Sequence, residues 1–301
     1  SGDRVCVAVR DVESARFLKP MGDVGQVVPV LANIRDEDSL NAAVQGADAV
    51  VTSVGVLFNR GHQTFGSIHV DGAERVAKAA ASAGAKRLVH VSALGADPES
   101  SSAYARSKAE GEARVREAFP GATVVRPGVV FGAEDQFFNR FAALSIFPMP
   151  LPVFGCGFPK MTMEGLKIYG DGGTRFQPVY VGDVADAILN ALEVENEEKR
   201  IYELGGPSIY SFKKLMEILL EEIKKKRFLI PIPFGFAKFQ SYFLQMLPNP
   251  LLTSDQVEIL KHHNVVSGDH PTLKDLGITG TPIQSILPKY IYRFRSGGQF
   301  G

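Results

Sequence analysis

The stretch RLVHVSALGADPESSSAYARSK, residues 87–108, decides the fold. It opens with an apolar, β-branched run, residues 87–91, which predicts a buried strand. Ser92 follows at the carboxyl end of that strand, and Tyr104 comes twelve positions later, at the start of a helix predicted over residues 104–118. Lys108 lies four residues after Tyr104, on the same helix face, so its ammonium group can approach the Tyr104 phenol and favour the phenolate at neutral pH.

Ser92, Tyr104 and Lys108 are therefore candidate catalytic residues, at the spacing that nicotinamide-dependent reductases use. A Tyr-x-x-x-Lys pair alone is weak, because it arises often by chance. It gains weight here because an apolar strand precedes it and a second apolar strand, residues 122–126, runs into Pro127-Gly128 after it.

Short β-branched runs alternate with alanine-rich helical stretches through the first 130 residues. The further strands are predicted at 5–9, 27–30 and 49–53, and the further helices at 36–44 and 68–83. This alternation predicts the α/β class: a doubly wound, Rossmann-like parallel sheet with helices on both faces.

Ligands of such sheets bind beyond the carboxyl ends of the strands. The candidate cofactor-binding residues at those ends are Arg10, Asn33, Ile34, Ser53, Val54, Gly55, Ser92, Pro127 and Gly128, and the helix residues Tyr104 and Lys108 join them. Arg10 occupies the position that faces the adenosine ribose, where a guanidinium suits a 2′-phosphate and indicates NADP(H). The alternative is an ordinary exposed arginine at a strand end. Gly55 would let the backbone approach a nucleotide closely, or is only a turn residue.

One expected motif is missing. A dinucleotide-binding fold begins with a strand and a glycine-rich turn whose amides hold the pyrophosphate, about 20 residues before the ribose-contacting position. Only nine residues precede Arg10. We therefore expect the first strand and the phosphate loop to lie outside the given sequence, and cofactor affinity to collapse if the protein truly lacks them.

Composition excludes several classes of protein. Lysine plus arginine equals aspartate plus glutamate, 33 each, so no net charge favours nucleic acid, and we expect no DNA or RNA partner. Two distant cysteines, Cys6 and Cys156, form neither a disulfide framework nor a metal cluster, and the histidines lack metal-ligand spacing, so we expect no metal. No targeting peptide opens the sequence, and no apolar run is long enough to span a membrane.

Several segments together resemble a known family. They are residues 16–30, 90–96, 175–185, 255–260, 264–266 and 286–290. These runs are similar to the NADPH-binding accessory subunit of respiratory complex I, the NADH:ubiquinone oxidoreductase alpha-subcomplex subunit 9 family. That family is an atypical branch of the extended short-chain dehydrogenases, and the resemblance runs nearly end to end.

The resemblance implies NADPH held without turnover, with the Ser-Tyr-Lys triad vestigial. It implies partners among the other complex I subunits and a place where the peripheral arm meets the membrane arm, near the quinone site. The location would be the matrix side of the mitochondrial inner membrane, or the cytoplasmic face of a bacterial one. Carried over, Arg10 would contact the 2′-phosphate, Asn33 and Ile34 the adenine, residues 53–55 the cofactor backbone, and Tyr104 with Lys108 the nicotinamide ribose.

The domain boundary is expected near residue 146. Residues 1–146 would form the NADP(H)-binding domain, and residues 147–301 a smaller docking region, of which 176–204 return to the core sheet. Residues 224–252 place four cations, Lys224 to Arg227, before strongly apolar sequence, which suits anionic lipid. The alternative is that these apolar residues pack on their own core. The ending, residues 290–300, could dock on a partner or be a frayed terminus.

Two functions of different class remain. The leading one is a non-catalytic, NADPH-bound accessory subunit that stabilises the junction of complex I. The rival is a working NADP-dependent reductase or sugar-nucleotide epimerase, in which Ser92 polarises the substrate, Tyr104 is the acid or base, and Lys108 tunes it. A third class, an NADP(H)-sensing regulator, differs mainly in lacking a membrane-complex partner.

Overall fold

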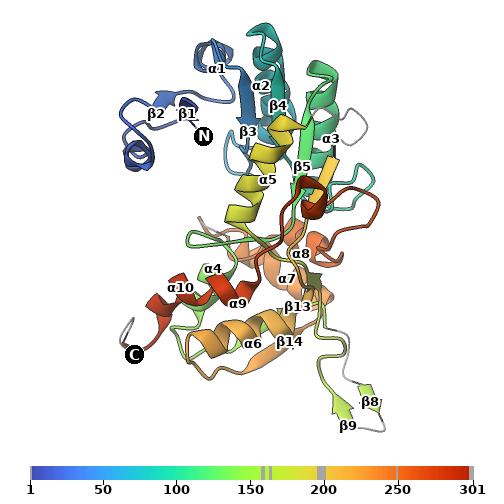
Figure 1. The fold of residues 1–301 in the computed structure, drawn as a ribbon. Coiled ribbons are helices and arrows are strands. Elements are labelled where there is room, and N and C mark those ends of the chain that lie inside the picture. The colour runs from blue at the N-terminus through green and yellow to red at the C-terminus, as the bar shows by residue number, and fades with distance from the viewer. Residues whose placement is uncertain (1, 157–159, 163–164, 195–200, 249, 298–301) are drawn as a thin grey trace. The chain divides into compact units, whose positions relative to one another are not determined.

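The computed structural model describes residues 2–156, 160–162, 165–194, 201–248 and 250–297 (Figure 1). The chain divides into two compact units. The first contains Ser1–Ser92 and Ser107–Val124, and the second contains Ala93–Arg106 and Val125–Gly301. The division falls within one helix and one strand, so each unit holds part of both.

The first unit contains the alternating elements that the sequence predicts. They are β1 (Val5–Val9), β2 (Val27–Leu31), α1 (Glu37–Val44), β3 (Ala49–Thr52), α2 (Asp71–Ser82), β4 (Arg87–Val91), most of α3 (Ala103–Ala118) and the start of β5 (Thr123–Pro127). A 3₁₀ helix, η1 (Arg16–Met21), was not predicted. β1 pairs with β2 and β3 pairs with β4, both in parallel, which confirms the α/β class.

Strands β1 to β5, with β12 (Ile201–Leu204), fall into two groups. One sheet has the order β12-β5-β4-β3, and β1 with β2 forms a separate pair. In a doubly wound sheet of order 3-2-1-4-5-6, the first strand lies between the second and the fourth. Strands β2 and β1 correspond to places 3 and 2 of this order, and β3 corresponds to place 4. No described strand occupies place 1, which explains why the two groups are not joined by hydrogen bonds.

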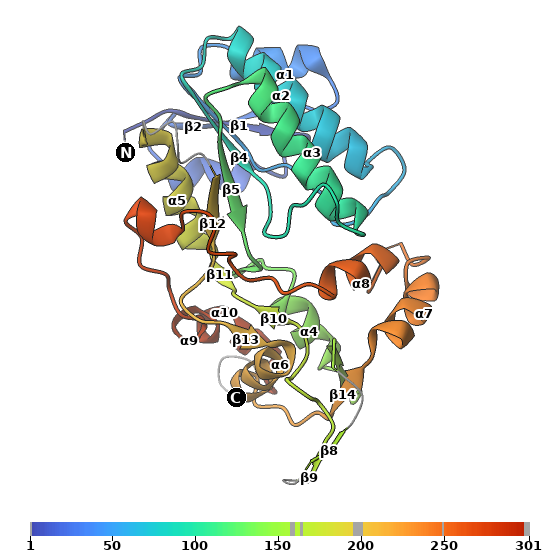
Figure 2. The same ribbon diagram turned by 90° about the vertical axis from the view of Figure 1, so that its right-hand side faces the viewer.

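Helices α2 and α3 lie side by side along strands β3 and β4 (Figures 1 and 2). Small residues make this packing close: Ala77 and Ala80 of α2 are fully buried. At Gly111 of α3 a Cβ atom would collide with the backbone carbonyl of His69, so glycine is needed there. His69 lies in η2 (Gly66–Val70), a π-helical turn that leads into α2. Such turns occur frequently at functional sites.

The second unit has a core rich in phenylalanine. Its helices are α4 (Phe138–Leu144), α5 (Val181–Glu193), α6 (Phe212–Glu222), α7 (Phe234–Leu244), α8 (Ser254–Leu260), η3 (Leu273–Leu276), α9 (Ile283–Ile286), α10 (Pro288–Ile291) and η4 (Tyr292–Phe294). Its remaining strands are β6 (Val130–Phe131), β7 (Leu151–Phe154), β8 (Lys160–Thr162), β9 (Gly165–Lys167), β10 (Arg175–Phe176), β11 (Val179–Tyr180), β13 (Tyr210–Ser211) and β14 (Leu229–Ile232). Ser211 caps α6, which begins at Phe212. The Phe212 ring contacts the rings of Phe141, Phe154 and Phe176.

The described part of the C-terminal tail packs on its own chain. Tyr290 and Ile291 are buried in the core of the second unit, and Tyr290 donates a hydrogen bond to Asp135 at 2.5 Å. Arg293 binds the side chain of Asn139, and Arg295 binds Glu222. These residues are therefore not frayed, and docking of the tail on a partner stays a prediction.

Candidate functional site

A buried lysine of α3 lies at the carboxyl end of β4, in the first unit. Lys108 of α3 is 6% exposed, and its ammonium nitrogen lies 3.4 Å from the carbonyl oxygen of Val91. Burial lowers the pKa of Lys108 to about 8, while the charge of Glu112 opposes this shift. A Cβ atom at Gly55 would lie 3.4 Å from the same nitrogen, so the loop after β3 passes close to it. The structure thus brings Gly55 and Lys108 together at the end of β4.

His69 connects this loop to α3, and sequence reasoning missed it. Its Nε2 accepts a hydrogen bond from the Val56 backbone N–H at 3.0 Å, so Nδ1 carries the proton and donates to Ser107 Oγ at 2.9 Å. Burial and then the Lys108 charge lower the pKa of His69 to about 3, so the imidazole is neutral. The only local signal was a histidine on the apolar face of a predicted helix, a pattern that a core residue shares.

Two buried polar side chains on one face of β4 have no hydrogen-bond partner among the described residues. They are His90, at both ring nitrogens, and Ser92, at Oγ. Both are at most 4% exposed. A buried polar group without a partner calls for an explanation, such as a bound water or ligand. For Ser92, which lies just beyond the strand, a ligand oxygen is the natural partner.

His90 should make the stability of the protein depend on acidic pH. Burial, then the charges of Lys108 and His69, lower its pKa to about 3. Below pH ~6.5 the unfolded chain binds more protons here than the folded chain, so the stability that His90 provides is complete above that pH and is lost as the pH falls toward 3. The free energy of unfolding, measured with urea, should fall between pH 7 and pH 5. We expect this fall to be about 2 kcal/mol smaller in His90→Leu than in the unsubstituted protein.

The matched control is His262→Leu, because His262 is exposed and its replacement should leave the pH-dependent loss unchanged. An identical loss in the His90→Leu protein would contradict the assignment of His90 as a buried neutral imidazole.

Tyr104 lies in the second unit, beside a carboxylate. Its backbone N–H donates to Asp255 Oδ2 at 3.1 Å. Burial, and then the charge of Asp255, raise the pKa of the Tyr104 phenol to about 12. The prediction that Tyr104 is a phenolate at neutral pH is therefore wrong for this structure, because burial, and then the Asp255 charge, oppose the negative charge.

The predicted adenosine-side residues lie in the first unit. Arg10 follows β1 directly and is exposed, as are residues 53–55 after β3. Asn33 is half-buried, and its Oδ1 accepts a hydrogen bond from the Arg35 N–H. The Ile34 side chain is only 8% exposed and packs in the core against α2, so its backbone rather than its side chain is what a ligand could reach.

Pro127 and Gly128 lie in the second unit, where β5 ends. The Pro127 carbonyl accepts a hydrogen bond from the Leu94 N–H, and the Gly128 N–H donates to the Leu204 carbonyl. A Cβ atom at Gly128 would lie 2.8 Å from the Gln177 carbonyl oxygen. Close backbone packing therefore already accounts for this glycine.

These observations test the site against a nicotinamide cofactor. The residues near the end of β4 fit the nicotinamide end of the cofactor. Ser92 Oγ has no partner among the described residues, and Lys108 lies beside Gly55, which has no side chain to fill the space. The 2′-phosphate end fits an exposed guanidinium at Arg10. The pyrophosphate has no counterpart among the described residues, since they include no glycine-rich turn before β1. The residues present can therefore bind and orient the two ends of such a cofactor.

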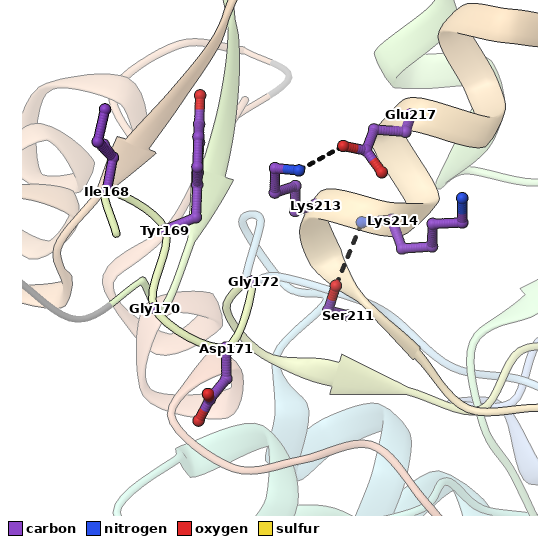
Figure 3. A pocket seen from close by; sticks show the side chains of 9 residues that line it. All are labelled: Ile168, Tyr169, Gly170, Asp171, Gly172, Ser211, Lys213, Lys214 and Glu217. Carbon is purple, nitrogen blue, oxygen red and sulfur yellow. Dashed lines mark hydrogen bonds and ion pairs between the residues drawn. The ribbon is translucent and has the colours of Figure 1, made fainter. Parts of the chain in front are cut away.

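A surface pocket of about 490 Å³ lies in the second unit, beside the start of α6 (Figure 3). It is lined by Ile168, Tyr169, Gly170, Asp171, Gly172, Ser211, Lys213, Lys214 and Glu217. The ammonium of Lys213 is already paired with Glu217, and the Ser211 side chain accepts the Lys214 N–H (Figure 3). The two lysines of this pocket are therefore not both available to bind the diphosphate of a sugar nucleotide.

Helix α7 presents an apolar surface. We call this the α7 surface; it comprises Phe236, Phe239, Tyr242, Phe243 and Met246, each between 52% and 82% exposed. The opposite face of the helix buries Ala237 and Ser241 completely. The alternative for this segment, packing on its own core, holds for its other face, because Phe234, Ala237 and Leu244 pack on the core of the second unit. Among the described residues, no helix combines the length and the apolarity that crossing a membrane requires.

Comparisons with known proteins agree with this fold. Residues 1–136 match the family model NAD_binding_10, described as NAD(P)H-binding. A dTDP-glucose 4,6-dehydratase from Streptomyces venezuelae has the same fold, with a TM-score of 0.69 and 20% identity over 98% of this chain and 88% of that one. The protein therefore has a Rossmann-like α/β fold, and its N-terminal part belongs with NAD(P)H-binding domains.

Two longer relatives are more specific. NADH dehydrogenase [ubiquinone] 1 alpha subcomplex subunit 9 of Arabidopsis thaliana is 33% identical, over 99% of this chain and 73% of its own length. The NADH-ubiquinone oxidoreductase 40 kDa subunit of Neurospora crassa is 30% identical, over 99% and 75% respectively. The chain belongs to the NADH dehydrogenase [ubiquinone] 1 alpha subcomplex subunit 9 family, as its sequence motifs indicated.

Proposed function

We propose that this protein is a non-catalytic, NADPH-binding accessory subunit of respiratory complex I. It stabilises the junction of the peripheral and membrane arms near the quinone site, on the matrix side of the mitochondrial inner membrane, in contact with other complex I subunits. The observation that carries the proposal is the similarity to complex I subunits over nearly the whole chain.

The state of Tyr104 supports a role without turnover. A general acid or base works best with a pKa near the operating pH. The pKa of Tyr104 lies far above neutral pH, at about 12, because the side chain is buried and Asp255 is close to it. Under the rival reductase or epimerase function, a positive charge would have to lower this pKa. Burial and the Asp255 carboxylate raise it instead, which supports a role without turnover.

The α7 surface supports a docking role for residues 224–252. Its aromatic side chains are exposed together, and Lys224 and Lys226 are exposed just before β14. Apolar residues beside cations suit the surface of an anionic membrane, where each cation contributes about 1 kcal/mol. We propose that this surface lies on lipid at the base of the complex.

Purification from the native membrane tests the proposal. In mild detergent, the protein should co-migrate with complex I on a native gel, and mass spectrometry should find the other subunits with it. Elution as a free polypeptide contradicts the proposed function.

A further inference from the structure

His69 joins two elements of the first unit that lie far apart in the sequence. Its Nε2 accepts the Val56 N–H at 3.0 Å, and its Nδ1 donates to Ser107 Oγ at 2.9 Å. Val56 belongs to the loop after β3, while Ser107 lies on α3, directly before Lys108. One imidazole therefore links this loop to the helix that carries Lys108, and all of these residues belong to the first unit.

The His69 ring is held in one orientation. It stacks on the Phe65 ring, with 5.4 Å between the centroids and 19° between the planes, and only 2% of the residue is exposed. The backbone of His69 is packed as well, because its carbonyl oxygen lies where a Cβ atom at Gly111 of α3 would be. Since ring and main chain are both packed, the two hydrogen bonds of the imidazole keep a fixed geometry.

The two bonds exist together only while the imidazole is neutral. A protonated imidazole has two donors and no acceptor, so it could not bind the Val56 N–H. Burial, and then the charge of Lys108, lower the pKa of His69 to about 3. The ring is therefore neutral at physiological pH, and the link between the loop and α3 is complete there.

This link brings Gly55 against Lys108 at the carboxyl ends of the parallel strands. A Cβ atom at Gly55 would lie 3.4 Å from Lys108 Nζ and 3.5 Å from His69 Nε2. Lys108 Nζ lies 3.4 Å from the Val91 carbonyl oxygen, and the Oγ of the next residue, Ser92, has no partner among the described residues. Ligands of such sheets bind at this edge. The loop, Lys108 and Ser92 therefore lie together where a ligand is expected.

We propose that His69 is a positioning residue for the cofactor site: it ties the loop that carries Gly55 to α3, so that this loop and Lys108 bind NADPH together. This inference rests on the proposed binding of NADPH. His69 acts through the Val56 amide and the Ser107 hydroxyl. Because it is almost completely buried, it touches no cofactor atom itself.

Two variants each break one side of the link. In His69→Asn the amide lies near the position of Nδ1, so the bond to Ser107 is kept and the Val56 N–H loses its acceptor. In His69→Gln the amide reaches the position of Nε2, so Val56 stays bound and the bond to Ser107 is lost.

Isothermal titration of the full-length protein measures the effect. We expect each His69 variant to bind NADPH about tenfold more weakly, because each loses one buried hydrogen bond. The affinity for adenosine 2′,5′-bisphosphate, which has neither the nicotinamide nor its ribose, should stay unchanged. A general loss of structure would weaken both ligands, so the difference between them isolates positioning.

Asn59→Ala is the matched control. Asn59 Oδ1 accepts the Phe65 N–H at 2.7 Å, so this variant also removes a bond to the backbone between β3 and η2, but one that does not reach α3. It should leave the affinity for both ligands unchanged. Full affinity for NADPH in either His69 variant, or an equal loss of both ligands, would overturn the inference.

Amide hydrogen exchange provides a readout without cofactor. The Val56 amide should exchange faster in His69→Asn and at the original rate in His69→Gln, because only the first variant removes its acceptor. Equal rates in the two variants would also overturn the inference. If the unsubstituted protein fails to bind NADPH while Val56 responds as expected, the NADPH-binding part of the proposed function fails and the link that His69 makes between the loop and α3 stands.

Discussion

Replacing Phe236, Phe239 and Phe243 of the α7 surface together by serine is expected to release the protein from complex I. Each side chain is more than half exposed, so its loss should leave the fold intact. Burying one aromatic side chain at an interface contributes about 1.5–3 kcal/mol. Three such losses should abolish co-migration with the complex on a native gel, while the free protein keeps its melting temperature.

Phe17→Ser is the control for this experiment, because Phe17 is also exposed but lies in the first unit. Substitution is preferable to truncation after Arg227, which would remove the core residues Leu287 and Ile291 and unfold the second unit. Normal assembly of the triple variant would rule out the α7 surface as a docking site.

Arg10→Ala is expected to weaken the binding of NADPH by about 10- to 100-fold and to leave NADH unchanged. The reason is that a guanidinium forms charge-assisted hydrogen bonds with a phosphate, worth about 1.5–3 kcal/mol, and NADH has no 2′-phosphate. Isothermal titration with both nucleotides measures the difference. Exposure of Arg10 at the end of β1 leaves it free to reach a ligand without disturbing the core.

The control is Arg4→Ala, since Arg4 is exposed at the opposite end of the same strand. It should leave both affinities unchanged. If Arg10→Ala weakens NADH and NADPH equally, the 2′-phosphate assignment is wrong.

Local patterns in the sequence were sufficient for most of the fold. Strand β4 begins and ends where its β-branched run does, and Ser211 caps α6 through its own side chain. The end of α2 was also readable, because Gly84 has a φ of +75°, which favours glycine. These features depend on residues a few positions apart, so hydrophobic period and capping chemistry reveal them.

The electrostatics of the site could not be read in this way. Asp255 lies 151 residues from Tyr104, and nothing in the spacing of Tyr104 and Lys108 indicates that a carboxylate opposes the phenolate. The bonds of His69 to Val56 and Ser107 likewise join separate elements. Ile34 was chosen for its position after a strand, but the direction of its side chain depends on packing against α2.

The NADPH content and reactivity of purified complex I test the central claim most directly. In complex isolated from the native membrane, this subunit should be present with about one NADPH per subunit, and that NADPH should stay reduced while NADH drives quinone reduction. Isolation of this subunit outside the complex, oxidising NADPH rapidly with a small carbonyl substrate, would contradict the account.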